Sequence, residues 1–256
     1  IFLLRTYFNE QYFEDYQQFL LSIVDSVCID RGSFYEPGPV TSFAFPSEGE
    51  KEIVLQIEDQ TIRTKMDISD IEANQFVIER EYAVLTLYQS SELWKEAWQR
   101  YYRMIYRDTY KRLLYASFDI QNALLNKLYE KPDIDIDYEL SNTLLHWTQT
   151  FSYERNVGDS DFAPVPSMLV GGGSDCDSRS MLLTVLLSQM NYKTMLFVSA
   201  TYSHAIFGID IPGDGARIAF GGNNYLLGET TAKVDLGLIA SDMADAKQWI
   251  PISGIQ

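Results

Sequence analysis

A cysteine stands where a glycine-rich loop turns into an apolar helix. Residues 171–183 read Gly-Gly-Gly-Ser-Asp-Cys-Asp-Ser-Arg-Ser-Met-Leu-Leu, which puts Cys176 at the expected helix start. The first turn of a helix has unpaired backbone N–H groups and a partial positive charge, and both stabilise a thiolate. The position therefore predicts a nucleophilic Cys176 with a lowered thiol pKa. The same N–H groups are candidates for part of an oxyanion hole.

Two further residues complete the parts of a thiol nucleophile site. His204 lies in Tyr-Ser-His-Ala-Ile, 28 residues after the cysteine, and Glu229 lies in Leu-Gly-Glu-Thr-Thr, 25 residues further on. The first interval fits a helix, a strand and a return, and the second fits one more hairpin. His204 is then the proton acceptor for the thiol, and Glu229 holds the imidazole in one tautomer. Each residue also has an ordinary interpretation, as a packed cysteine, a core histidine and a surface carboxylate.

The other histidine and the other cysteine are expected to be structural. His146 lies in Leu-Leu-His-Trp, within an apolar helical stretch. Cys28 lies at the end of an amphipathic segment, where a packed thiol is expected. Two cysteines do not make a disulfide framework.

Periodicity predicts the elements that carry these residues. The first half is expected to contain a helix over 9–30 capped by Asn9, strands within 40–68, an ambiguous stretch over 76–88, and helical sequence over 91–129 with a break near Ser117. The segment 131–137 reads as a linker. Beyond it we expect a helix over 138–152, the helix that begins at Cys176 and ends near Asn191, and strands over 194–200, 204–210, 216–220 and 225–230.

These elements predict an α+β protein in two parts. Residues 1–132 form an N-terminal helical and β region of unknown role, and residues 133–256 form a domain built around the cysteine. In that domain the cysteine helix packs on an antiparallel sheet.

Residues 138–243 resemble the transglutaminase-like superfamily of papain-fold thiol enzymes, in its bacterial protease-like branch. The segment 174–180 is similar to the family's Gly-Asp-Cys-x-Asp/Ser-Lys/Arg-Ser block, and the helix ending at 151–153 is similar to the helix before that loop. His204-Ala205 resembles the family's His-Ala pair, and Glu229-Thr-Thr occupies the place of its Asp-Pro-Thr motif. The resemblance implies a papain-like core and a Cys176–His204–Glu229 catalytic triad.

Three departures from the family pattern bear on the substrate class. Ser174 replaces the usual glycine before Asp-Cys, and Ile206 stands where tryptophan is common after His-Ala. Glu229 replaces aspartate, which lengthens the side chain by one methylene and keeps its hydrogen-bond acceptor. None of the three removes a catalytic atom.

Three functions remain open on these residues. The first is a cysteine protease that hydrolyses amide bonds, or an acyl transferase in which an amine replaces water. The second is a catalytically silent transglutaminase-like domain that serves as a binding or scaffolding module. The third is a glycosidase, which draws on the acidic and aromatic composition but lacks an evident carboxylate pair.

Composition limits the partners. The net charge of −16 disfavours nucleic acid, because phosphate binding needs clustered cations. A protein or peptide substrate is expected, with no cofactor. Asp133, Asp135 and Asp137 lack the glycine and the distal glutamate of a calcium loop, and Cys176 with His204 lacks further zinc ligands. The start Ile-Phe-Leu-Leu fits the end of a removed signal or anchor, which favours the periplasm or cell envelope over the cytoplasm.

Overall fold

Five antiparallel strands form the sheet that carries the histidine. The computed structural model of the protein describes residues 3–154, 160 and 162–252 of the 256. Ile1 and Phe2, part of the suggested signal remnant, lie outside the described residues. The strand order is β5-β6-β4-β3-β7. The strands are β3 (Thr194–Ser199), β4 (His204–Ile209), β5 (Arg217–Phe220), β6 (Asn223–Gly228) and β7 (Ile250–Pro251). The four predicted strands are confirmed, and β7 is an additional edge strand paired with β3.

Helix α8 (Cys176–Gln189) packs against one face of this sheet, on β3 and β4. Its start is fixed by a capping box. Ser178 N–H donates to Oδ1 of Asp175 at 2.8 Å, and Asp175 N–H donates to the Ser178 hydroxyl at 3.0 Å. This reciprocal pair makes Cys176 the first helical residue, as the sequence predicts. The opposite face of the sheet holds a smaller apolar cluster that includes Phe197, Tyr225 and Trp249.

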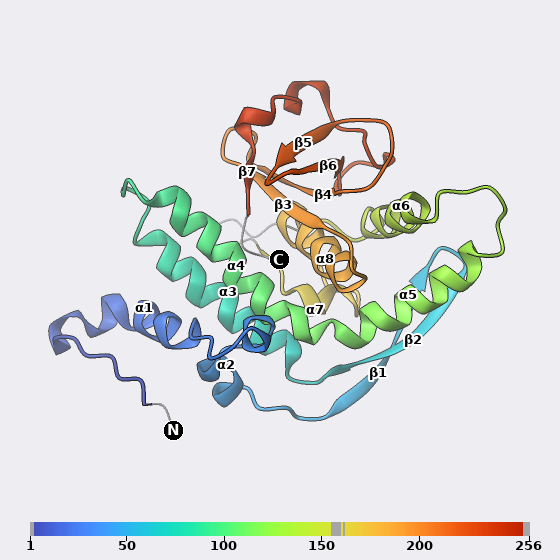
Figure 1. The fold of residues 1–256 in the computed structure, drawn as a ribbon. Helices are drawn as coiled ribbons and strands as arrows, with labels where there is room; N and C mark the ends of the chain where they lie inside the picture. The colour runs from blue at the N-terminus through green and yellow to red at the C-terminus, as the bar shows by residue number, and fades with distance from the viewer. Residues whose placement is uncertain (1–2, 155–159, 161, 253–256) are drawn as a thin grey trace.

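Helices surround the rest of α8 (Figure 1). The α-helices are α1 (Phe13–Asp25), α2 (Pro39–Ala44), α3 (Asp70–Thr86), α4 (Trp94–Arg112), α5 (Leu114–Leu128), α6 (Ile136–Thr148) and α7 (Val165–Met168). Short 3₁₀ turns are η1 (Glu10–Tyr12), η2 (Gly32–Tyr35), η3 (Ser241–Met243) and η4 (Ala246–Gln248). Asn9 caps η1, and α1 ends at Asp25, earlier than predicted.

The ambiguous stretch 76–88 is helical. It belongs to α3, whose buried residues recur every three or four positions on one helix face, at Asp70, Ala73, Val77, Arg80 and Val84. The break expected near Ser117 falls at Leu113, between α4 and α5. Helices α3 and α4 pack side by side as a pair (Figure 1).

A separate two-stranded hairpin packs on α5. It consists of β1 (Glu50–Ile57) and β2 (Gln60–Asp67) in antiparallel register. Burial alternates along β1, with Ile53, Leu55 and Ile57 turned toward the helices. These strands are the half-buried strands that period-two alternation predicts.

Both halves of the sequence contribute to one apolar core. Its buried members include Ile57 and Ile105 from the first half and Leu144, Leu186 and Phe207 from the second. The observed fold is α+β, with helices on an antiparallel sheet, as predicted. The predicted domain boundary near residue 132 falls in the connection between α5 and α6. The division of the chain into two domains stays a prediction.

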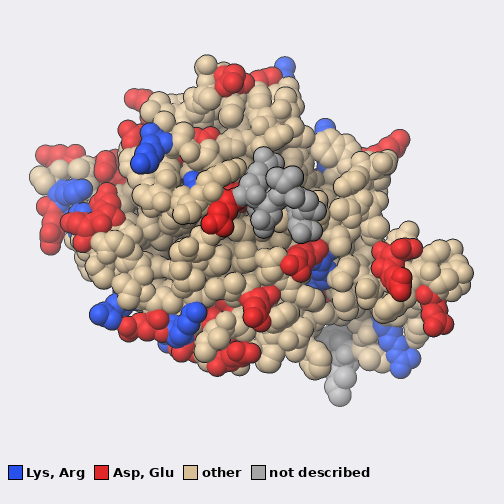
Figure 2. Space-filling model, turned by 180° about the vertical axis from the view of Figure 1, so that it is seen from behind, with Lys and Arg blue, Asp and Glu red and all other residues tan. Residues whose placement is uncertain are grey.

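The surface carries the acidic excess of the sequence. Acidic side chains lie in several groups across the face shown in Figure 2, with basic side chains scattered between them. Among the described residues, no helix combines the length and apolar character that crossing a bilayer requires. The expected partners and cellular location stay predictions.

Candidate active site

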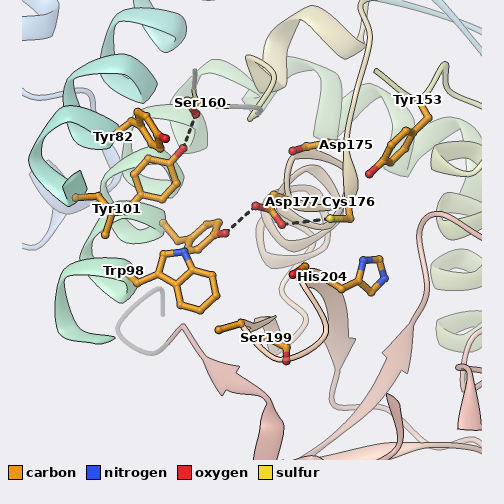
Figure 3. Close-up of a pocket in the computed structure, with 14 residues that line it drawn as sticks. Tyr82, Trp98, Tyr101, Tyr153, Ser160, Asp175, Cys176, Asp177, Ser199 and His204 are labelled. Carbon is orange, nitrogen blue, oxygen red and sulfur yellow. Dashed lines mark hydrogen bonds between the residues drawn. The ribbon is translucent and has the colours of Figure 1, made fainter. Parts of the chain in front are cut away.

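Cys176 lines an open cleft between two parts of the fold. The cleft has a volume of about 260 Å³, and Cys176 and His204 both line it. Figure 3 shows Asp177, Cys176 and His204 on one side and the rings of Tyr82, Trp98 and Tyr101 facing them from α3 and α4. The sulfur therefore has a groove leading to it, although Cys176 is only 9% exposed.

His204 and Glu229 form a close and enclosed pair. Nε2 of His204 lies 2.7 Å from Oε2 of Glu229, and their side chains are 11% and 8% exposed. A carboxylate only accepts hydrogen bonds, so Nε2 carries the proton and Nδ1 is left as the acceptor of the neutral ring. The other oxygen of Glu229 accepts from the N–H and hydroxyl of Thr231, at 2.7 and 2.6 Å. The carboxylate is thus fixed on both sides.

The start of β4 lies against the sulfur. The backbone N–H of Ala205, the residue after His204, hydrogen-bonds the sulfur of Cys176. Helix α8 packs along β4, which brings the helix start and the strand start to the same end of the sheet. Cys176 and His204 thus line one cleft, and Glu229 joins them through its contact with His204. Their catalytic roles stay predictions.

The protonation of the thiol differs from the sequence-based expectation. Burial raises the pKa of the Cys176 thiol well above its ordinary value, and the charges of Asp177 and Asp175 act in the same direction. The Ala205 N–H opposes them without reversing the shift. A lowered pKa was expected from the helix start; the shift runs the other way first because the sulfur is buried and second because Asp177 and Asp175 place negative charge beside it.

The pKa of Glu229 moves the opposite way. Burial acts to raise it, but the hydrogen bond and charge of His204 and the two bonds from Thr231 outweigh burial and hold it below its ordinary value. Glu229 is therefore ionised at neutral pH, as an orienting carboxylate must be.

Asp177 connects the thiol to the N-terminal helices. The thiol donates to Oδ1 of Asp177 at 3.4 Å, and the hydroxyl of Tyr102 on α4 donates to Oδ2 at 2.7 Å. Sequence reasoning gave neither residue a role. Asp177 carried a local signal, as a charge adjoining a nucleophile, whereas Tyr102 is 75 residues away and no local pattern connects the two.

Arg179 holds the loops around the site. Its guanidinium donates to the Ser174 hydroxyl at 2.8 Å, the Thr230 carbonyl at 3.0 Å and the Phe151 carbonyl at 2.7 Å. Because Thr230 follows Glu229, this one side chain ties the cysteine helix to the loop that carries the carboxylate. Arg179 thus has a positioning role in this site.

The glycines before the cysteine allow close loop packing. A Cβ on Gly172 would lie 2.9 Å from the Ser167 carbonyl oxygen, and a Cβ on Gly173 would lie 2.2 Å from the Glu154 carboxylate. A side chain at Gly172 would push the loop away from α7, whereas one at Gly173 would require the Glu154 carboxylate to move.

His146 and Cys28 lie away from the cleft. His146 is half-exposed on α6, with Nε2 2.9 Å from Asp235. Cys28 is exposed rather than packed, because α1 ends three residues before it. Within the described ranges, no group of three or more histidine, cysteine or carboxylate residues is arranged to hold a metal ion.

The fold and the site define an α+β protein with a cysteine at a helix start beside a histidine–carboxylate pair. Scans against protein-family models and curated proteins find no match. Among solved structures, the chain is similar to Legionella pneumophila LapG (EGTA-treated) at 12% identity and a TM-score of 0.34, over 68% of this chain and 78% of that one. The transglutaminase-like resemblance therefore rests on the sequence blocks and on the arrangement of the three residues.

Proposed function

We propose that this protein is a thiol-dependent acyl-transfer enzyme, and specifically a peptidase that hydrolyses amide bonds with Cys176, His204 and Glu229. The observation that carries the proposal is the 2.7 Å His204–Glu229 pair beside the cleft that contains the cysteine. A buried carboxylate that fixes an imidazole next to a thiol is the arrangement required for base-assisted nucleophilic attack.

The first half-reaction forms a thioester. Nδ1 of His204 takes the thiol proton as the sulfur bonds to the carbonyl carbon, and the carbonyl oxygen takes up negative charge near the start of α8. The tetrahedral intermediate collapses, the carbon–nitrogen bond breaks, and the imidazolium gives its proton to the leaving amine. Glu229 stabilises the imidazolium throughout.

The second half-reaction releases the acyl group. Water gives a proton to Nδ1 and attacks the thioester carbon, and the returning proton restores the thiol. If an amine attacks in place of water, the product is a new amide. The raised pKa of the Cys176 thiol favours transfer of its proton to His204 during the attack rather than before it.

The second candidate is a catalytically silent binding module. It is favoured by the same raised thiol pKa and by the low exposure of Cys176, because both slow the reaction of a thiol. In that case the cleft would bind peptide without cleaving it.

Covalent labelling separates the two candidates. A peptidyl vinyl sulfone and iodoacetamide are applied to the Cys28→Ser protein, and modification of the peptide that contains Cys176 is followed by mass spectrometry. If the protein is an enzyme, we expect Cys176 to be labelled in the protein that keeps Cys176 and His204, and labelling to be lost in Cys176→Ala. The labelling rate should fall by about 10²- to 10⁴-fold in His204→Asn. Native protein that labels no faster than the His204→Asn variant supports the binding module. Adding a primary amine during cleavage of a peptide then tests for amine transfer.

A further inference from the structure

An uncharged aromatic pocket continues from the cleft. It has a volume of about 270 Å³ and is lined by residues of α3, of α4, of the turn between them and by Ala200. Four lining residues are shared with the cleft that contains the cysteine, namely Tyr82, Leu85, Trp98 and Ala200. We call the outer hollow the aromatic pocket. Because the two hollows share a wall, one extended ligand can enter both.

The aromatic pocket is built from rings held in place by packing. The ring centroids of Trp94 and Trp98 lie 6.1 Å apart, and Trp98 lies 6.1 Å from Tyr102. Tyr82 and Trp98 also pack against the main core, which fixes that side of the pocket. Trp94 is partly exposed in the first turn of α4, where it forms the outer wall.

The lining selects the chemistry of the ligand. None of the described residues that line the aromatic pocket is charged, and most present ring or aliphatic surface. At the other end, Asp175 and Asp177 place negative charge beside the thiol. A bulky apolar side chain gains from burial in the pocket, whereas an acidic one is repelled near the reacting carbonyl.

We propose that the aromatic pocket is a specificity subsite, which binds an aromatic or other bulky apolar side chain on the acyl part of a peptide substrate while the scissile carbonyl lies at Cys176. The inference rests on the proposed function, and it gives residues of the N-terminal region a role. Trp94 and Trp98 are specificity-determining residues, and the helices that carry them form one wall of the substrate cleft.

Matched peptidyl electrophiles test the proposal. The probes are three-residue peptidyl vinyl sulfones in pairs that differ only by Phe or Ala at one position, and each position is varied in turn. We compare the rates at which the two members of a pair label Cys176 in the Cys28→Ser protein. We expect the Phe probe to react at least about tenfold faster at one position. Trp94→Ala should reduce that ratio toward one, and Trp94→Phe should retain part of it.

Controls separate this subsite from the underlying chemistry. Phe118→Ala removes an aromatic ring that is 63% exposed on α5, away from the cleft, and should leave the ratio unchanged. Iodoacetamide reports the reactivity of the thiol without using the pocket, and a thermal unfolding scan checks that each variant is folded. If iodoacetamide and the Ala probe react in a His204-dependent way but Phe gives no preference at any position, the subsite is refuted and the proposed function stands. If no reagent reacts at Cys176, both fail.

Discussion

Nε2 of His204 lies 2.7 Å from Oε2 of Glu229, in a site where both side chains are almost fully enclosed. Enclosure strengthens the interaction because little water screens it. The neighbouring Trp249 ring, 6.3 Å from the imidazole between centroids, covers the pair further. The imidazole is therefore held in one orientation and one tautomer before any substrate arrives.

Replacing Glu229 by Gln should lower the rate of Cys176 labelling by a peptidyl electrophile by about 10²- to 10⁴-fold. The amide removes the charge that stabilises the imidazolium. It also places an NH2 donor against either the Thr231 N–H and hydroxyl or the His204 Nε2–H, all of which donate to the native carboxylate. The matched control is Glu130→Gln, which makes the same chemical change at an exposed position. A Glu229→Gln rate within threefold of the control would remove Glu229 from the proposed triad.

Asp177→Asn should raise the reactivity of the thiol at neutral pH. The aspartate charge acts to raise the pKa of the Cys176 thiol, and asparagine removes that charge while keeping an oxygen that can accept from Tyr102. The measurement is the rate of iodoacetamide alkylation at Cys176 as a function of pH. We expect the rising limb of the profile to move to lower pH. Asp242→Asn, on the exposed η3 turn, should leave it in place. An unmoved limb in Asp177→Asn would contradict the electrostatic account.

The raised thiol pKa also predicts how stability responds to alkaline pH. A free cysteine titrates near pH 8.5. Above that value the unfolded chain loses the Cys176 proton while the folded chain keeps it, so the group's contribution to stability is present below that pH and is lost as pH rises. The free energy of unfolding should therefore fall more steeply with pH for the native protein than for Cys176→Ser.

The difference between the two slopes is at most about 1.4 kcal/mol per pH unit, because one proton is involved. Denaturant unfolding of both proteins between pH 7 and 10 measures it, and parallel curves would contradict the shift.

Local sequence was sufficient to predict the elements that carry the site. Cys176 at a helix start follows from the glycine-rich loop that precedes an apolar helical run, and His204 at a strand start follows from the period of the flanking residues. Intervals that fit a helix, a strand and a hairpin then predicted that Glu229 returns to the histidine. Short-range patterns sufficed here because the three residues lie within 54 positions of one another.

The opposite wall of the cleft was not predictable in this way. Tyr82 lies in the stretch whose secondary structure the sequence left ambiguous, and Trp98 and Tyr102 lie in sequence predicted only to be helical. Tyr102 contacts Asp177 from a buried position. Their place beside the cysteine depends on how α3 and α4 dock against the second half of the chain. The thiol pKa was predicted in the wrong direction for a related reason, because burial is a property of the assembled fold.

The docking of α1 on α3 depends on a buried charge cluster. Arg80 on α3 lies 2.7 Å from Asp25 of α1 and 2.9 Å from Glu81, and each of these side chains is at most 2% exposed. Arg100 of α4 also pairs with Glu81, which extends the cluster to the helix that carries Trp98. Two buried carboxylates are thus balanced by two guanidinium groups.

Arg80→Met should destabilise the protein by about 3–5 kcal/mol, because it leaves Asp25 without its guanidinium partner in a site that excludes water. Arg63→Met is the matched control. Arg63 also pairs with a glutamate at 2.7 Å, but the two side chains are 70% and 64% exposed, so its loss should cost less than about 1 kcal/mol. Denaturant unfolding of the two variants compares them directly, and equal losses would show that the cluster does not hold α1 in place.

Arg80→Met should also weaken the preference for a Phe probe under conditions where it remains folded, because the same cluster positions α3 and α4 around the aromatic pocket.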